Sequence, residues 1–471
     1  MQKRYVNPMR YVLMVCVLAV SACAPDGLYH ESGRALEPGR ALVTVYLNAF
    51  GSSSRTVTFA LEDLALVDGG APRHVDIDSF YVDSRKASDR QLLIGAAVVD
   101  AGNYSGLSFR LAGVQVDGAP EGGEAPVLNL SFPNLVSLGA GDSVCLFVNW
   151  SLDEAASQSG RFVSKFSAQG QVMPLSGELI YVACDDIDTI YLVGTDRNRV
   201  AASVGLVGPL GSLRIDSERR RLYAVSGGAR SIFVMDCDAH RFIDRIALPM
   251  TLAPRYMDLS DDGEFAYVTD AQTNRVIKVD LAAGVAAAQS NDALYAPGRV
   301  LFMKTDLGDL LAVGSPATRQ IYILNAENLG LRQTLPAGLE PEGMFYDEGL
   351  LYACDRASDA VLVFSIRDGR QRAQIAVGTA PTHITAESGG RIYVSNTGED
   401  SLSVIVSGQH TAFRRIPSGP GPFALTVSRH RQVLYAANRN DKKLTVLDLN
   451  SDSILSEIPL GGMPRSMDQK F

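Results

Sequence analysis

Charged side chains recur close behind a proline in the second half of the sequence. The segments "APRY", "APGR", "EPEG", "APTH" and "MPRS" supply six candidate ligand-binding residues: Arg255, Tyr256, Arg299, Glu342, His383 and Arg465. A guanidinium group forms paired hydrogen bonds with a carboxylate, so three arginines, a histidine and a glutamate in one place could hold an anionic or peptide ligand. The competing interpretation is a solvated rim, because residues at strand ends are commonly charged only because they face water.

These segments lie far apart in the chain, and a repeated fold is needed to bring them together. Seven units each contain a short apolar strand, a polar loop, a strand ending in Asp or its equivalent, a third strand and a Pro-led fourth. One aligned position, with spacings of 42, 44, 44, 41, 41 and 42 residues, holds Tyr181, Tyr223, Tyr267, Leu311, Tyr352, Tyr393 and Tyr435. A period in the low forties built only of short strands is typical of β-propellers. The spacing predicts seven blades over residues 179–471.

The seven units resemble the YVTN family of seven-bladed β-propellers, as in "LIYVACDDIDTIYLV" at Leu179 and "RIYVSNTGEDSLSVIV" at Arg391. The single tryptophan, Trp150, lies outside the repeats, which disfavours propeller families with Trp-bearing repeats. The resemblance implies that the loops before the Pro-led strands and those between the second and third strands share one face, around the channel mouth. That second group of loops would add Asp355, Arg356, Asn396, Asn438 and Arg439.

The phase of the repeats predicts how the ring closes. The first unit begins at Leu179 with its second strand, and the sequence finishes with the Pro-led segment "MPRSMDQKF". Residues 464–471 should therefore become the innermost strand of the blade formed by residues 179–207. This pairing would remove the free edges of the ring, which otherwise invite association between molecules.

The segment 41–175 has a different organisation. Short alternating strands separated by Gly, Pro and Asp turns predict a β-sandwich of about eight strands. The order "VVDAGNYSGLSFRLAGVQVDG", "LNLSFPN", "LGAGDSVCLFVNWSLD" resembles a widespread bacterial lipoprotein sandwich domain of unknown function, and the resemblance implies no activity. The predicted fold class is therefore all-β, with an N-terminal β-sandwich followed by a seven-bladed β-propeller closed by the C-terminal strand.

The first forty residues predict where the protein is located in the cell. Residues 1–22 combine Lys3, Arg4 and Arg10 with a ten-residue apolar core, which is typical of a secretory signal peptide. The segment "VSAC" that ends at Cys23 resembles a bacterial lipobox, which implies acylation of Cys23 and a lipid anchor to the membrane. Residues 23–40 would then be a flexible tether. Ala24 at the next position implies the bacterial outer membrane, facing the periplasm or the cell surface. The alternative is a secreted soluble protein cleaved after Ala22.

Composition and missing motifs exclude several classes of function. With 52 acidic and 43 basic residues and no basic block, the chain is a poor nucleic acid partner. It has no HExxH, GxSxG, P-loop, GxGxxG, CxxCH or paired CxxC motif, so the sequence predicts no cofactor and no metal ligands and leaves any catalytic residues unknown. The remaining cysteines are expected to be small buried residues, with a Cys145–Cys184 bridge as the alternative; they are Cys145, Cys184, Cys237 and Cys354.

The function that these patterns favour is binding or scaffolding at the cell envelope. The expected partner is an envelope protein or a small anionic ligand at the channel mouth. The alternative is a propeller enzyme, a lactonase-like hydrolase or lyase, that uses a metal or His383 and Glu342. The acidic turn "SDDGE", Ser260 to Glu264, is a second candidate for calcium.

Overall fold

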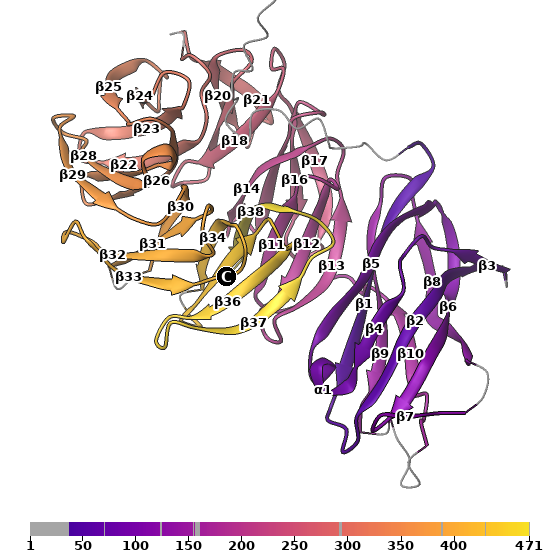
Figure 1. Ribbon diagram of the computed structural model, residues 1–471. Coiled ribbons are helices and arrows are strands. Elements are labelled where there is room, and N and C mark those ends of the chain that lie inside the picture. The colour runs from indigo at the N-terminus through magenta and orange to yellow at the C-terminus, as the bar shows by residue number, and fades with distance from the viewer. Residues whose placement is uncertain are drawn as a thin grey trace, which may run out of the picture. The chain divides into compact units, whose positions relative to one another are not determined.

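The computed structural model describes residues 37–470, apart from 70, 123–124, 154, 156–160, 292–293, 388–389 and 429. The predicted signal peptide (1–22), Cys23 and most of the predicted tether lie outside the described residues. Almost every described element is a β-strand (Figure 1), and the two short helical segments are α1 (Ser84–Ala87) and a 3-10 turn (Arg356–Ser358). The predicted all-β class is confirmed. Within the described ranges, no helix is long and apolar enough to span a membrane.

Seven four-stranded antiparallel sheets follow one another from residue 179. The first contains β11 (Leu179–Cys184), β12 (Thr189–Gly194), β13 (Arg199–Gly205) and β38 (Pro464–Lys470). The second contains β14 (Leu210–Asp216), β15 (Arg221–Ser226), β16 (Ser231–Asp236) and β17 (Arg241–Ala247). The third contains β18 (Pro254–Leu259), β19 (Phe265–Asp270), β20 (Arg275–Asp280) and β21 (Val285–Gln289). The fourth contains β22 (Val300–Thr305), β23 (Gly308–Ser315), β24 (Gln320–Asn325) and β25 (Leu331–Pro336).

The last three sheets repeat this order. The fifth contains β26 (Pro341–Asp347), β27 (Leu350–Asp355), β28 (Ala360–Ser365) and β29 (Gln371–Ala376). The sixth contains β30 (Pro381–Ala386), β31 (Arg391–Asn396), β32 (Ser401–Val406) and β33 (Ala412–Pro417). The seventh contains β34 (Pro422–Ser428), β35 (Val433–Asn438), β36 (Lys443–Asp448) and β37 (Ser453–Pro459).

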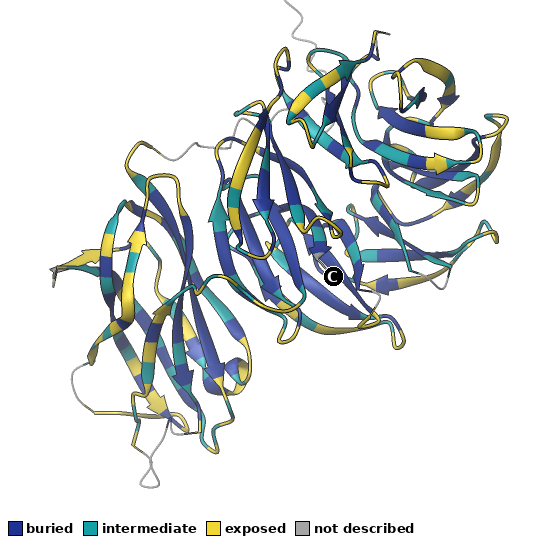
Figure 2. Cartoon of the chain, turned by 180° about the vertical axis from the view of Figure 1, so that it is seen from behind, coloured by how far each residue is buried: buried dark blue, intermediate teal, exposed yellow. Residues whose placement is uncertain are grey.

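Burial within each sheet explains the sequence pattern of the repeats. The second and third strands, such as β27 and β28, are buried almost throughout, because neighbouring sheets cover both of their faces. Fourth strands such as β17 and β29 are mostly exposed (Figure 2). In six of the seven sheets the turn between the second and third strands ends in a residue with positive φ, for example Asn274 (58°) and Asp359 (52°). Asn and Asp tolerate this left-handed conformation better than most residues.

The sheets form a closed cycle through their first strands. Along the chain, each of β14, β18, β22, β26, β30 and β34 contacts the next. Strand β34 also contacts β38, and β38 contacts β14, which completes the cycle. Strand β38 pairs antiparallel with β11, with Ala183 opposite Ser466. The predicted pairing of the last Pro-led segment with the first unit is thus confirmed over the described residues, which extend to Lys470.

Two further sheets precede the repeats. One holds β10 (Phe166–Gly170), β9 (Ser143–Ser151), β1 (Arg40–Phe50) and β5 (Gln91–Asp100), with β1 and β9 parallel. The other holds β3 (Ala71–His74), β2 (Val57–Asp68), β6 (Gly102–Val116), β7 (Ala119–Pro120), β4 (Phe80–Asp83) and β8 (Val127–Leu138). Both contribute to one hydrophobic core, where the Phe59 and Phe166 rings lie 5.0 and 5.6 Å from Trp150.

Two glutamines from these early sheets occupy the free edge of β13. The Gln91 amide donates to Val200 O (3.0 Å) and accepts from Val200 N (2.8 Å). Gln171 makes the same pair of bonds to Ser203, at 3.0 and 2.9 Å. A side-chain amide presents the same donor and acceptor as a peptide group, so these residues satisfy backbone groups that a further strand would otherwise pair.

The four described cysteines form no disulfide bond and are fully buried. Burial raises the pKa of the Cys145 thiol to about 12, and its Sγ donates to Ser203 Oγ at 3.3 Å. The expectation of small buried residues is confirmed, and the alternative Cys145–Cys184 bridge is absent.

Candidate functional site

The six predicted site residues come together at one end of the first strands. Arg255 and Tyr256 lie in β18, Arg299 directly precedes β22, and the other three lie in β26, β30 and β38. Tyr256 is the common contact: Arg465 Nη2 donates to its hydroxyl at 2.9 Å. The guanidinium carbons of Arg255, Arg299 and Arg465 lie 5.8, 5.3 and 5.6 Å from its ring centre, within the range of cation–π attraction.

Glu342 and His383 complete the predicted set. Glu342 Oε2 lies 3.6 Å from Arg299 Nε. His383 lines a cavity together with Tyr256 and Arg299, and its Nδ1 has no hydrogen-bond partner among the described residues. Burial and the nearby charges of Arg299 and Arg214 lower the pKa of His383 well below 6.5, so its imidazole is neutral at pH 7.

Three further residues belong to the same group. Phe423 in β34 lies 5.7, 5.1 and 5.7 Å from the guanidinium carbons of Arg299, Arg439 and Arg465. Asp185 bridges two of these arginines, with Oδ1 3.1 Å from Arg439 and Oδ2 3.1 Å from Arg465. We call Arg255, Arg299, Arg439 and Arg465 the arginine cluster.

The sequence analysis did not predict Phe423 and Asp185 as site residues, although their positions in the repeats could have indicated them. Phe423 follows Pro422 at the same offset as Arg255 follows Pro254, and Asp185 occupies the position after a second strand that Arg439 occupies in its own repeat. Arg439 was among the wider loop candidates.

The other loop candidates bond to neighbouring loops within the chain. Asp355 Oδ1 accepts from Leu339 N (3.0 Å) and Glu340 N (2.8 Å), and Asn396 Oδ1 accepts from Gly378 N (3.2 Å). Asn438 accepts from the Ser418 hydroxyl at 3.4 Å, and Arg356 pairs with Glu340. These contacts hold the loop that leads into the first strand of the same sheet, and a role of this group in ligand binding stays a prediction.

Burial separates the arginine cluster from an ordinary wet surface. The side chains of Arg465, Arg299 and Arg439 are 6%, 15% and 21% exposed. Burial, together with the charge of Arg465, lowers the pKa of Arg255, which still leaves a guanidinium ionised at pH 7. Although burial opposes its charge, Tyr256 and Asp185 raise the pKa of Arg465. The interpretation as a solvated rim therefore fits these residues poorly.

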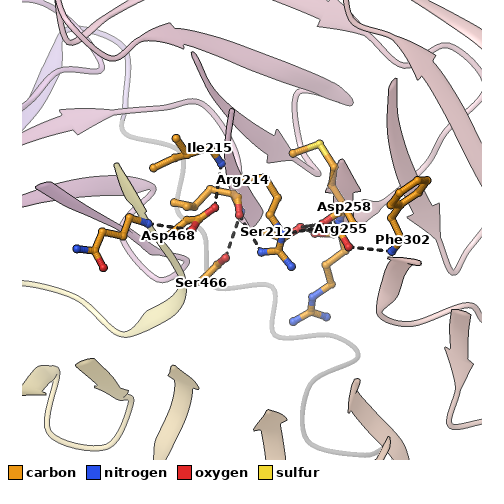
Figure 3. Close-up of polar contacts among 11 residues, drawn as sticks. Ser212, Arg214, Ile215, Arg255, Asp258, Phe302, Ser466 and Asp468 are labelled. Atoms are coloured by element: carbon orange, nitrogen blue, oxygen red, sulfur yellow. Dashed lines mark hydrogen bonds and ion pairs between the residues drawn. The ribbon is translucent and has the colours of Figure 1, made fainter. Parts of the chain in front are cut away.

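Beneath the cluster, polar side chains join the first strands across the sheets (Figure 3). Arg214 Nε pairs with Asp258 Oδ1 (2.8 Å), and Asp258 Oδ2 accepts from Phe302 N (2.9 Å). Asp468 Oδ2 accepts from Ile215 N (2.9 Å). Because the first strand of each sheet leaves one backbone edge unpaired, these bonds satisfy groups that the sheet itself cannot.

The second row of this network uses serine hydroxyls. Ser466 Oγ accepts from Leu213 N (3.1 Å), and Ser212 Oγ accepts from Met257 N (2.6 Å). A partly open cavity of about 30 Å³ lies between this floor and the arginine cluster, lined by residues that include Ser212, Arg214, Tyr256, Met344 and His383. A space of this size holds one or two water molecules, so a larger ligand would bind on the outer side of the arginines.

The charge balance at the mouth is positive. The cluster has four guanidinium groups against the carboxylates of Asp185 and Glu342, an excess of two positive charges. The floor adds one arginine and two aspartates, which leaves an excess of one when all are ionised. The protein as a whole carries a net charge of −9, so this region stands out as a site for an anion.

No metal site is evident in the part of the chain that the structure describes. Its His, Cys, Asp and Glu side chains form no group of three or more that could hold an ion. In the "SDDGE" turn, Asp262 Oδ1 instead accepts from Ser260 Oγ (2.6 Å) and Glu264 N (2.9 Å), so it closes the turn.

Comparison with known proteins identifies a fold and nothing finer. No protein-family model and no curated protein matches the chain. A functionally unknown protein from Desulfotomaculum acetoxidans DSM 771 aligns with a TM-score of 0.55 at 12% identity, covering 62% of this chain and 99% of that one. Hydrazine synthase of Kuenenia stuttgartiensis aligns with a TM-score of 0.50 at 14% identity, covering 57% and 91%. The chain is therefore a β-rich protein whose fold is similar to those of β-propeller-like proteins.

Proposed function

We propose that residues 179–471 form a seven-bladed β-propeller of the YVTN type, preceded by a β-sandwich over residues 41–175. Seven consecutive four-stranded sheets and the closed cycle of their first strands support the propeller. The shared core of the two early sheets supports the sandwich.

The propeller is a binding or scaffolding module that takes an anionic ligand at the arginine cluster. The observation that carries this proposal is the group of four arginines around two aromatic rings with only two carboxylates among them. Guanidinium groups that are fixed and partly desolvated bind a carboxylate more strongly than solvated ones, because the attraction is less screened and little side-chain freedom is lost.

The alternative, a propeller enzyme that uses His383 and Glu342, is supported by no hydrogen bond between these two side chains in the part of the chain that the structure describes. Glu342 pairs with Arg299, and the His383 Nδ1 has no hydrogen-bond partner among the described residues, so no hydrogen bond joins Glu342 to this nitrogen. The arrangement therefore supports binding better than a paired acid and base.

The proposed location is the bacterial outer membrane, where acylation of Cys23 after removal of residues 1–22 would anchor the protein. Mass spectrometry of the mature protein and membrane fractionation test it. Cys23→Ala should lose acylation and membrane retention, whereas Cys16→Ala should change neither.

Titration calorimetry with glutarate and citrate at low salt tests the anion site. We expect Arg255→Gln to weaken binding at least tenfold, because a charge-assisted hydrogen bond contributes about 1.5–3 kcal/mol. Arg332→Gln in the outer strand β25 removes the same charge elsewhere and should bind as wild type does. Binding that is absent, or equal in the two variants, would contradict the proposal. Arg465 is less suitable for this substitution, because its ion pair with Asp185 joins β38 to the loop after β11 and its loss would also affect that junction.

A further inference from the structure

Four loops beside the arginine cluster expose large apolar side chains. These loops precede β14, β18, β22 and β26, which belong to four consecutive sheets of the cycle. Their exposed residues, each 48–74% accessible, are Val207, Met250, Leu252, Tyr295 and Leu339. We call these five residues the apolar crescent. Exposing so many apolar side chains in equivalent loops leaves a free energy of burial available to a partner.

The backbone of each crescent loop is fixed by the last residue of a second strand. Asp270 Oδ2 accepts from Leu252 N at 2.5 Å, and Asp355 Oδ1 accepts from Leu339 N at 3.0 Å. In the other two loops the last residue of the second strand is a serine, and its hydroxyl donates to a backbone carbonyl. Ser315 donates to Tyr295 O, and Ser226 donates to Val207 O. The outward apolar side chains therefore stand on anchored loops, so binding would cost little backbone ordering.

The crescent differs from the rest of the propeller surface. Other large exposed apolar residues from β14 onward lie on outer fourth strands: Ile243, Val285, Leu331, Phe413, Ile454 and Leu455. Single apolar residues of that kind are normal on a protein surface. The equivalent positions in the loops before β30, β34 and β38, two residues before the proline, hold Thr379, Pro420 and Gly462 in place of a large exposed apolar residue. The crescent therefore occupies one side of the mouth only.

Four of the five crescent residues, all except Val207, lie a few positions before a residue of the charged mouth. Leu252 precedes Arg255, Tyr295 precedes Arg299, and Leu339 precedes Glu342. The surface thus combines a positively charged centre with an apolar flank, and tyrosine, methionine and arginine are the residue types enriched at protein interfaces. A ligand that satisfies both regions must carry carboxylates and apolar groups together.

We infer that the mouth binds an acidic, apolar peptide segment of a partner protein, with a carboxylate on the arginine cluster and apolar side chains on the crescent. This inference rests on the proposed anion-binding function. A peptide fits better than an acyl chain, because the apolar positions belong to separate loops and suit separate side chains. An extended peptide presents side chains on one face at every second residue. The cavity of about 30 Å³ beside the arginine cluster is too small for a lipid tail.

The test is a selection from a display library of random 12-residue peptides with free C-termini, followed by fluorescence polarisation with synthetic copies of the enriched peptides. We expect enrichment of Asp or Glu beside Leu, Ile, Phe or Tyr. The crescent variant Met250→Ser, Leu252→Ser, Tyr295→Ser should bind these peptides at least tenfold more weakly. The matched control, Ile243→Ser, Val285→Ser, Phe413→Ser, removes three exposed apolar residues from outer strands and should stay within twofold of wild type. Equal melting temperatures establish that both variants fold.

The inference is overturned if no acidic, apolar peptide is enriched, or if the crescent variant and its control bind equally well. Crescent-dependent flotation with phosphatidylglycerol vesicles, or crescent-dependent self-association in size-exclusion chromatography, would assign the surface to a lipid or to a second copy instead. Glutarate separates the two proposals. If the wild type and the crescent variant both bind glutarate but neither binds an acidic, apolar peptide, the proposed anion site stands and the peptide inference is refuted. Failure of the wild type to bind glutarate through Arg255 removes the proposed function itself.

Discussion

Replacing Asp258 by alanine tests how the first strands of neighbouring sheets are held together. Its carboxylate pairs with Arg214 from β14 and accepts from the backbone of Phe302 in β22, so one side chain in β18 connects three sheets. The Asp258 side chain is 15% exposed and that of Arg214 is 29% exposed, so water replaces these contacts incompletely.

The magnitude follows from the two bonds. A hydrogen bond to a charged group contributes about 1.5–3 kcal/mol, and a buried N–H left without a partner costs about 1–3 kcal/mol. Because both side chains keep some solvent contact, we expect Asp258→Ala to lower the free energy of unfolding by about 3 kcal/mol, near the lower end of the sum. Asp258→Asn retains an acceptor for Phe302 N and should lose about half as much, roughly 1–2 kcal/mol.

Urea denaturation followed by far-UV circular dichroism measures the effect. The single tryptophan, Trp150, lies in the core of the two early sheets, so its fluorescence reports on that region separately. Asp261→Ala is the matched control, because its side chain is 64% exposed and its ion pair with Lys304 is a surface one. The reasoning is refuted if Asp258→Ala falls within about 0.5 kcal/mol of this control, the range expected for a surface pair, or if the asparagine variant is destabilised as much as the alanine variant.

Three further predictions concern closure, pH and thiol reactivity. Deleting residues 464–471 removes β38 and leaves one edge of β11 unpaired, so the melting temperature should fall and the deleted protein should associate; an unchanged melting temperature would contradict the closed cycle. Burial and the carboxylates of Asp185 and Asp186 raise the pKa of Asp188 from 3.8 to about 7. The folded state therefore holds this proton more tightly than the unfolded state, and Asp188 makes folding less favourable as pH rises from about 4 to 7. Asp188→Asn should stabilise the protein at pH 8 and have little effect at pH 4 in urea denaturation, and equal effects at both values would disprove this account. The four buried thiols should react with Ellman's reagent only after unfolding, because burial suppresses the thiolate; rapid labelling of any of them in the native protein would show otherwise.

Much of the repeated half could be predicted because each strand carries its own local signal. The apolar period and the Pro-led segments identify the strands and place Arg255 and Arg465 at equivalent ends of them. Phe423 was missed because an aromatic residue at a strand end suggests packing rather than contact with arginines. Asp355 was assigned to the mouth for the opposite reason: a charged loop residue suggests a ligand, whereas its carboxylate binds backbone N–H groups.

Features that depend on distant partners could not be predicted from the sequence. The parallel pairing of β1 with β9 has no local signature, because alternation is the same in either direction. Gln91 and Gln171 read as ordinary polar strand residues, and their role depends on the edge of β13 that they meet. The apolar crescent was also missed, since exposure of a loop leucine depends on which neighbours cover it.

The pairing of β38 with β11 has a consequence for the order of folding. Arg465 and Asp185, which meet across this junction, are 280 positions apart in the chain. Contacts of such long range form slowly, because the chain between them must first be ordered or confined. We expect the six other sheets, whose strands are consecutive in sequence, to form earlier, and the sheet of β11 to be completed last. Until then the backbone edge of β11 remains open to pairing with other chains. We therefore expect the nascent protein to need protection from aggregation until the cycle of sheets has closed.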